Sequence, residues 1–203
     1  MRVSREQVTE NRRTIVDVAS RLFRERGFEA VTVAEIMKEA GLTHGGFYGY
    51  FSSKDELIAE ALADALTRTT TGPLGDLATY TAQYLSPSLR DDRARGCPTA
   101  ALAAETVRHP GGARTEMTTG IKQQIDRLSH VSPGSTTALK RRAAIGAWAA
   151  MVGAMILARA TDDRALSDEL LEQTRAWLET RVKDPGRRRS RSKPASTRGR
   201  ARK

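Results

Sequence analysis

The chain has 203 residues, a formal net charge of +10 and a sequence pI near 10.3, and 39% of its residues are hydrophobic. This length is enough for one or two compact domains with their own cores. One cysteine excludes an internal disulfide framework and a cysteine-based zinc cluster, and the three scattered histidines make no convincing metal site.

The positive charge is concentrated near the end of the sequence. Residues 185–203 hold nine Lys or Arg and no acid, so they supply +9 of the total, whereas residues 1–60 sum to −1. The same segment lacks large apolar side chains that would offset its ordering entropy, so we expect a disordered basic tail. The pI alone therefore says little about the folded residues.

No segment suggests export or a membrane span. The N-terminal residues lack an apolar signal-peptide core, and the longest uncharged apolar run, residues 143–158, is shorter than the roughly 20 residues that a span needs. We expect a cytoplasmic protein that makes no membrane contact.

The folded part is expected to be helical throughout, since no run shows sustained period-2 alternation. Capping residues and breaks such as Gly72-Pro73 and Ser86-Pro87 predict helices over residues 5–26, 33–40, 44–50, 54–70, 76–84, 98–108, 113–130, 137–159 and 165–183. We divide the chain into an N-terminal domain over residues 1–60, a helical bundle over 61–184 and the tail over 185–203.

The N-terminal domain contains a helix-turn-helix, because two short helices flank the turn Gly41-Leu42-Thr43. Thr32 and Ser53 each precede a Glu by three residues, which predicts capping boxes. The second short helix holds three glycines within residues 44–50. Each costs roughly 0.5–1 kcal/mol relative to Ala in a helix interior, but lets the backbone approach another surface closely.

These segments resemble the TetR family of bacterial transcriptional regulators. The resemblance covers about residues 10–60 and rests on Thr32-Val33-Ala34-Glu35-Ile36, Ala40-Gly41-Leu42-Thr43, Phe47-Tyr48-Gly49-Tyr50-Phe51 and Ser53-Lys54-Asp55-Glu56-Leu57. It implies an all-α fold with a three-helix DNA-binding domain, a ligand-binding and dimerisation bundle, and no enzymatic activity, metal or cofactor. The implied function is a repressor that binds palindromic operator DNA as a homodimer and leaves it when an effector binds.

The resemblance also implies DNA contacts by position. Thr32 and Lys54 correspond to phosphate contacts, and Tyr48 to a tyrosine that reaches the DNA backbone. The other positions expected at the DNA are Thr43, His44, Gly45, Gly46, Gly49 and Tyr50. Many members carry larger side chains at the glycine positions, so base reading would fall to the tyrosines and the histidine, or DNA shape would matter more. The alternative is that the tyrosines are half-buried core residues and the histidine an inert surface residue.

The last two helices are expected to form the homodimer interface. Within the helix over residues 137–159, the segment 139–157 is apolar nearly all round, and residues 165–183 carry leucines and Trp177 at helical spacing. The family resemblance implies that this pair meets its mates in a four-helix bundle, which suits a two-fold operator. An ordinary core within one chain would explain the same pattern.

Cys97 precedes Pro98 and therefore falls at a predicted helix N-cap, where the helix dipole favours a thiolate. The Gly96-Cys97 pair resembles a TetR subgroup in which some members sense electrophiles or oxidants through the cysteine. The alternative is a small buried hydrophobe. The family further implies a small-molecule pocket in the bundle, with candidate lining residues Cys97, Tyr80, Tyr84, Met117, Ile121, Trp148 and Met151, although plain core positions would look the same.

Two other functions remain open at this point. One is a non-specific architectural DNA-binding protein that uses the basic tail. The other is an enzyme with Cys97 as nucleophile, whose nearest base in sequence, His109, would lie about 18 Å along the same helix.

Overall fold

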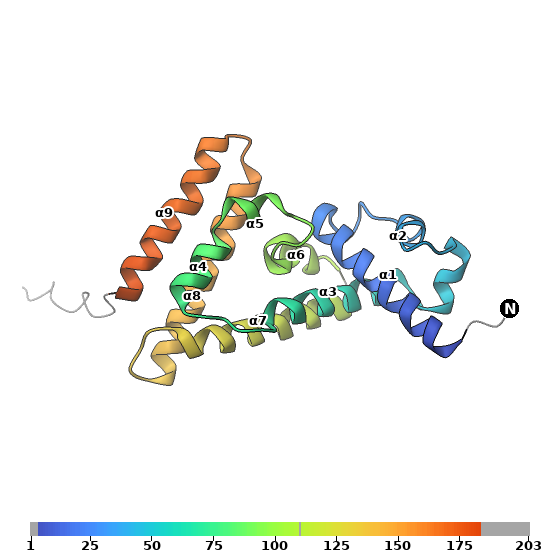
Figure 1. Ribbon diagram of the computed structural model, residues 1–203, viewed down its shortest axis with the longest axis horizontal. Helices are drawn as coiled ribbons and strands as arrows, with labels where there is room; N and C mark the ends of the chain where they lie inside the picture. The colour runs from blue at the N-terminus through green and yellow to red at the C-terminus, as the bar shows by residue number, and fades with distance from the viewer. Residues whose placement is uncertain (1–3, 110, 184–203) are drawn as a thin grey trace, which may run out of the picture.

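The computed structural model describes residues 4–109 and 111–183, and its regular secondary structure is helical throughout these ranges. The helices are α1 (Arg5–Arg26), α2 (Val33–Glu39), the 3₁₀ helix η1 (His44–Gly49), α3 (Lys54–Thr70), α4 (Leu77–Tyr84), α5 (Pro87–Asp91), α6 (Pro98–Thr106), α7 (Gly112–Val131), α8 (Thr137–Ala160) and α9 (Arg164–Lys183) (Figure 1). The expected all-α fold is confirmed. The predicted tail over residues 185–203 lies outside the described residues.

Short polar side chains begin most of these helices. Six N-cap residues each accept a hydrogen bond from the backbone N–H three positions later: Ser4, Thr32, Ser53, Asp76, Ser86 and Thr136. The two predicted capping boxes are only half formed. Glu35 pairs with Arg26 at 2.6 Å, and Glu56 accepts hydrogen bonds from the backbone N–H and the hydroxyl of Ser52.

Helix α5 is absent from the sequence prediction, which read Ser86-Pro87 as a break. Ser86 instead caps the helix through the N–H of Leu89, and Pro87 occupies the first helical position. Proline is tolerated there because the N–H it lacks would have no partner inside the helix. The same dipeptide therefore starts a helix where it was expected only to end one.

The N-terminal core is built from aromatic rings on α1, η1 and the adjoining loops. Phe23 meets Phe28 edge to face at 5.4 Å, and Phe47 stacks on Phe51 at 5.6 Å, all four rings being fully buried. Arg12 of α1 lies over the Phe51 ring and pairs with Glu56 and Glu60 of α3. These contacts fasten α1 to α3 on both sides of η1.

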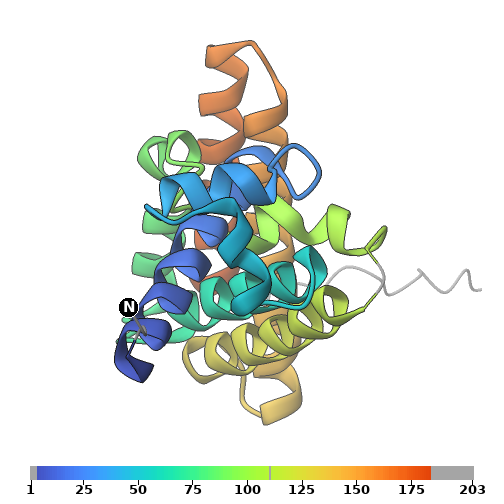
Figure 2. The same ribbon diagram turned by 90° about the vertical axis from the view of Figure 1, so that its right-hand side faces the viewer.

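Helix α3 is continuous across residue 60, where the sequence division was placed. Leu57 and Leu66, on either side of that point, belong to one buried cluster that also contains Met117 of α7. α3 runs beside α7 along the lower edge of Figure 1 and carries the N-terminal domain on the bundle. Figure 2 looks onto that domain, with the α8–α9 pair behind it and projecting beyond it.

A second core joins α4, the end of α7, α8 and α9. Its fully buried members include Leu128 on α7 and Met151 and Met155 on α8. Within the described residues, α8 is the one helix long and apolar enough to cross a membrane on length and composition alone. In this fold it packs against α7 on one side and α9 on the other.

Candidate DNA-binding surface and interior pocket

The turn of the helix-turn-helix is set by Gly41. Its φ of +73° is left-handed, and no heavy atom lies within 4 Å of a Cβ placed there, so backbone conformation and not space requires glycine. The N–H groups of Leu42 and Gly41 donate to the carbonyls of Met37 and Lys38 at 2.8 and 3.1 Å. This Schellman pattern ends α2 and fixes the direction in which η1 leaves.

The second short helix is 3₁₀ and buries a single aromatic side chain. Phe47 is buried, whereas Tyr48 packs its ring edge to face on Phe47 at 5.3 Å and remains 75% exposed. Three glycines in six residues give poor α-helical propensity, so packing of Phe47 holds the segment. Tyr48 is thus a surface residue, and its interpretation as a core aromatic is excluded.

The outer side of η1 carries few side chains. Thr43 and His44 are exposed, and a Cβ at Gly45 or Gly49 would meet nothing within 4 Å. The backbone of η1 is therefore accessible from outside, with Tyr48 as the large side chain on it. A Cβ placed at Gly46 would instead lie 3.6 Å from the Thr43 hydroxyl oxygen and 3.9 Å from the Met37 side chain, so this position faces the protein.

Two further predicted DNA contacts are engaged within the protein. The Tyr50 hydroxyl accepts a hydrogen bond from the Asn11 side chain at 2.8 Å, and the Lys54 ammonium donates to the Phe28 carbonyl at 2.6 Å. Both side chains are half-buried. The Tyr50 bond ties the end of η1 to α1, and the Lys54 bond ties the start of α3 to the loop after α1. The Tyr50 hydroxyl proton and two of the Lys54 ammonium hydrogens remain available for other partners. Thr32 caps α2 and is exposed.

The bundle contains a pocket of about 250 Å³ between its two cores. Of the predicted lining residues, Tyr80, Tyr84, Cys97 and Trp148 line it, whereas Met117, Ile121 and Met151 do not, since they pack in the cores. Sequence reasoning did not single out the remaining lining residues as pocket candidates: Leu66, Thr69, Gln83, Leu89, Arg95, Gly96, Thr99, Gly120 and Gln124.

The pocket wall contains buried polar groups. Gln124 is buried, and its amide nitrogen donates to the Tyr80 hydroxyl at 2.8 Å. The Gln124 carbonyl oxygen and the Tyr84 hydroxyl are buried without a hydrogen-bond partner in the described part of the chain. Burial raises the pKa of both tyrosines above the ordinary value of 10, so both phenols keep their protons at neutral pH.

Cys97 occupies the N-cap of α6, as the sequence predicts, and its side chain is half-buried on the pocket wall. Its side chain makes no capping hydrogen bond. His109 lies beyond the other end of α6, where it packs on Phe28 and pairs with Glu29 at 3.2 Å. The cysteine and this histidine thus sit at opposite ends of the helix.

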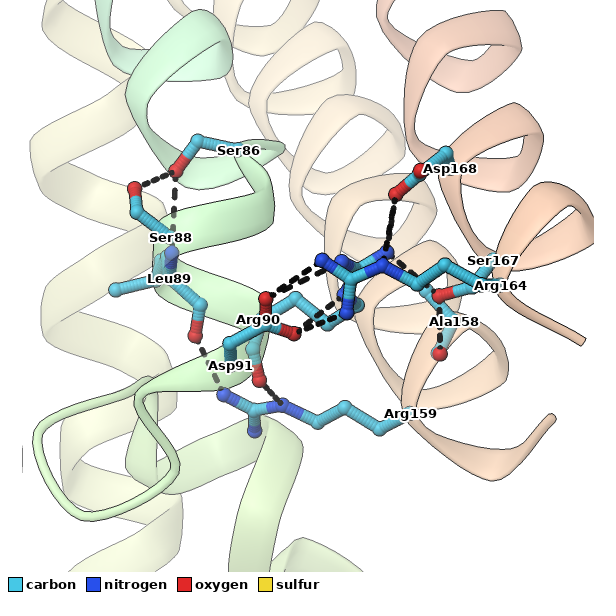
Figure 3. Close-up of polar contacts among 10 residues, drawn as sticks. All are labelled: Ser86, Ser88, Leu89, Arg90, Asp91, Ala158, Arg159, Arg164, Ser167 and Asp168. Carbon is cyan, nitrogen blue, oxygen red and sulfur yellow. Dashed lines mark hydrogen bonds and ion pairs between the residues drawn. The ribbon is translucent and has the colours of Figure 1, made fainter. Parts of the chain in front are cut away.

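Figure 3 shows how α5, beside the pocket, is clamped to α8 and α9. The buried Arg90 donates to the Ser167 hydroxyl at 2.8 Å and to the Asp168 carboxylate at 2.5 Å. Arg159 of α8 donates to the carbonyls of Leu89 and Arg90. Since Leu89 also lines the pocket, one wall of the pocket is fastened to the last two helices.

The outer faces of α8 and α9 expose large apolar side chains. On α8, Ile145 and Ile156 lie eleven residues apart on one helical stripe, and the adjacent Leu157 is 56% exposed. On α9, Leu166 and Trp177 are similarly exposed. Scattered apolar residues on a surface are normal, but several on one helix pair indicate an interface.

Comparison with known proteins supports this architecture. Residues 15–61 match the family described as bacterial regulatory proteins, tetR family. The transcriptional regulator TtgR of Pseudomonas putida is 39% identical over 69 residues, which make up 34% of this chain and 32% of TtgR. The N-terminal part of this chain is therefore similar to the DNA-binding part of TetR-family regulators.

The fold comparison extends the TetR likeness to the bundle. A TetR-family regulator from Agrobacterium tumefaciens superposes with a TM-score of 0.69 at 21% identity, covering 85% of this chain and 98% of that one. The reduced form of NemR from Escherichia coli gives 0.66 at 22% identity, over 84% and 96% of the two chains. At these identities the likeness concerns the fold alone. The chain spans about a third of the length of TtgR, and the match lies in the helix-turn-helix half.

Proposed function

We propose that this chain is a TetR-family transcriptional repressor that binds a palindromic operator as a homodimer and is released by a small molecule. The observation that carries the proposal is the exposed side chain of Tyr48 on the outer side of η1. The fold of the single chain does not require this exposure, because the buried ring of Phe47 holds the helix in place. Such a helix can enter the major groove of DNA. The site of action would be the cytoplasm, on the nucleoid.

The DNA-contacting residues in this proposal fall into two groups. Thr43, His44 and Tyr48 contact the groove and its rim, while the open backbone at Gly45 and Gly49 lets η1 approach closely. Because so few side chains point outward, much of the sequence preference comes from DNA shape and few direct base contacts remain. Thr32, Gly46, Tyr50 and Lys54 position η1 or bind flanking phosphates.

The homodimer would form through α8 and α9, whose exposed stripes meet those of a second chain. The two-fold axis then places two copies of η1 on successive major-groove faces, roughly 34–36 Å apart or a multiple of it. A single chain would cover one half-site, so dimerisation supplies both affinity and the palindromic preference.

Release by an effector would use the contacts at the two ends of α6. Its N-cap, Cys97, lines the pocket, and Glu105 near its other end accepts a hydrogen bond from the Phe28 N–H of the N-terminal domain at 2.7 Å. A molecule that shifts α6 therefore acts on the orientation of the helix-turn-helix. It lowers DNA affinity only to the extent that it prefers the non-binding arrangement.

The test is a selection of bound sequences from a random DNA pool, using the full chain and a chain that ends at Asp184. We expect both to enrich one palindrome, with weaker non-specific binding and a shallower salt dependence for the shorter chain. Failure of either chain to enrich a palindrome would overturn the proposal. Loss of all DNA binding on truncation would instead support the architectural reading, in which residues 185–203 carry the affinity.

Cys97 favours a second regulatory role, sensing of electrophiles, because the thiol lies both at a helix N-cap and on the pocket wall. In this proposal an electrophile that enters the pocket is attacked by the sulfur, and the adduct occupies the effector site. We expect Cys97→Ser to abolish release of operator DNA by N-ethylmaleimide. Unchanged release would exclude this role and leave the reversible one intact.

A further inference from the structure

The unused hydrogen-bonding capacity of the pocket points to the chemistry of its ligand. The Gln124 oxygen is a buried acceptor with no partner in the described residues, and the Tyr84 hydroxyl is a buried donor that faces only the weakly accepting Cys97 sulfur there. A buried polar group left unpaired costs about 1–3 kcal/mol. Two such groups on one pocket wall are best explained by a ligand that satisfies both.

The Gln124 amide is held in one orientation by the protein. Its nitrogen donates to Tyr80 at 2.8 Å, which leaves the carbonyl oxygen as the free atom. That oxygen can only accept, so the ligand group facing it must donate. The Tyr84 phenol is kept protonated by burial and can donate to an oxygen of the ligand. A hydroxyl group both donates and accepts, so it has the chemistry that either atom requires.

The charge of the lining limits the ligand further. Arg95 is the single charged residue among the described lining residues, and it is exposed at the α5–α6 loop. Arg127 and Arg159 lie near the two tyrosines, but their guanidinium groups donate to backbone carbonyls and neither residue lines the pocket. A carboxylate or ammonium placed beside Gln124 would therefore be desolvated without a counter-ion in the pocket wall, which is strongly unfavourable. The buried part of the ligand is therefore uncharged.

The size and the walls of the pocket indicate a flat ring compound. A cavity of about 150 Å³ holds benzene in other proteins, so about 250 Å³ suits one or two rings. The rings of Tyr80 and Tyr84 lie 6.0 Å apart, and Trp148 forms another part of the wall. Aromatic walls favour aromatic ligands through offset and edge contacts.

We propose that the pocket binds an uncharged aromatic alcohol of one or two rings, whose hydroxyl donates to the Gln124 oxygen and accepts from the Tyr84 hydroxyl. The binding itself depends only on the pocket. Its description as the effector site rests on the proposed function.

Equilibrium dialysis of the full chain against three probes tests the class. 2-Naphthol has the required hydroxyl, 2-methoxynaphthalene cannot donate, and 2-naphthoate carries a charge at neutral pH. We expect 2-naphthol to bind, the methyl ether to bind at least tenfold more weakly, and the carboxylate not to saturate. Equal binding of the alcohol and its ether, or tighter binding of the carboxylate, would overturn the proposal.

Two variants test the named atoms. Tyr84→Phe removes a hydroxyl whose contact in the described residues is with the weakly accepting Cys97 sulfur, so the fold keeps its stability while 2-naphthol binds about three- to tenfold more weakly. Gln124→Met keeps the side-chain length and should abolish the preference for the alcohol over its ether. Gln123→Met, at an exposed position of α7 outside the pocket lining, is the matched control and should leave 2-naphthol binding unchanged. Unchanged naphthol affinity in folded Tyr84→Phe contradicts the assignment.

The two proposals fail separately. If the chain enriches a palindrome but binds no 2-naphthol, the ligand class is wrong and operator binding stands. If 2-naphthol binds as expected but does not lower operator affinity, the ligand class stands and the release step of the proposed function is wrong.

Discussion

At the scale of single residues, two glycines of the helix-turn-helix differ in what they contribute. Gly41 has a left-handed φ of +73°, and Gly45 has an ordinary φ with open space around its missing side chain. The first is required by the turn that ends α2, whereas the second has no role in the fold of the single chain. Its absence of a side chain matters only for whatever approaches η1.

We therefore expect opposite effects from the same substitution at these positions. Gly41→Ala forces a side chain into a left-handed conformation and should lower the free energy of unfolding by about 1 kcal/mol. Gly45→Ala should raise it by up to about 1 kcal/mol, because alanine reduces the freedom of the unfolded chain. Urea denaturation of both variants checks this. Equal destabilisation would show that Gly45 is also constrained by the fold.

The sequence alone did not predict the roles of residues whose partners lie far away in the chain. The family motif identified Tyr50 and Lys54, but their partners, Asn11 and the Phe28 carbonyl, lie 39 and 26 residues away in the chain. Gln124 gave no signal at all, because its place beside Tyr80 results from the packing of α4 on α7. The positions of aromatic residues such as Trp148 were easier to predict from the sequence, since their size alone suggests a place in a core or on a pocket wall.

At the scale of elements, local sequence predicted the long helices best. The bounds of α1 and α3 agree with the prediction at both ends. The signals that set them, the Ser53 cap and the breaks at Gly27 and Gly72, lie within a few residues of the helix ends and can be recognised in the sequence. The two elements that differ are short. α5 was missed, and η1 is 3₁₀, since tertiary contacts through Leu89 and Phe47 decide whether such segments form.

Helix α5 has a second source of stability, the buried guanidinium of Arg90. Arg90→Ala removes its bonds to Ser167 and Asp168 and should lower the free energy of unfolding by about 1–3 kcal/mol. Arg164→Ala is the matched control, because Arg164 also pairs with Asp91 but is exposed and should contribute under about 1 kcal/mol. Thermal unfolding of the two variants measures the difference. A loss for Arg164→Ala as large as for Arg90→Ala would contradict this account.

The ion pairs of Asp91 with Arg90 and Arg164 should make the free energy of unfolding depend on pH in the acid range. Hydrogen bonds from Arg90 and then Arg164 hold the pKa of Asp91 well below its ordinary value of 3.8. A lowered carboxyl pKa contributes stability that is present above about pH 4 and is lost as the pH falls below it. We expect Asp91→Asn to unfold with a weaker dependence on pH between about 4 and 2 than the parent chain. An identical acid limb for both chains would exclude this contribution.

Helix α6 spans the distance from the pocket to the N-terminal domain, so its far end can be tested without any ligand. Glu105 accepts the hydrogen bond of the buried Phe28 N–H, and Glu105→Ala leaves that donor without its partner. We expect faster amide hydrogen exchange over residues 27–33 in this variant. Glu105→Gln retains a carbonyl acceptor and should preserve the protection. Equal exchange in both variants would indicate that this bond does not hold the loop.

At the scale of the whole molecule, the N-terminal domain and the bundle share α3 and are not separable units. One buried cluster runs from Ile15 on α1 to Met117 on α7, so the division at residue 60 describes roles and not independent folding. The match to the family profile ends at residue 61, within α3. Beyond it the likeness to known proteins is one of fold.

The exposed apolar stripe on α8 provides the test of assembly. Only 39% of the most apolar 18-residue window of α8 is buried within one chain, although α7 and α9 both pack against it. A charge in the middle of a dimer interface is desolvated without a partner and opposes association. We therefore expect Ile156→Glu to sediment as a monomer and to lose operator affinity at concentrations where the parent chain is a dimer.

The matched control for assembly is Val107→Glu, which places the same charge on an exposed valine at the end of α6, away from α8 and α9. It should sediment as the parent chain does. Circular dichroism spectra of both variants should keep the helical signal, since Ile156 is 44% exposed and the single-chain core does not need it. A folded Ile156→Glu chain that remains a dimer would place the interface on another surface, and the two copies of η1 would then have a different separation on DNA.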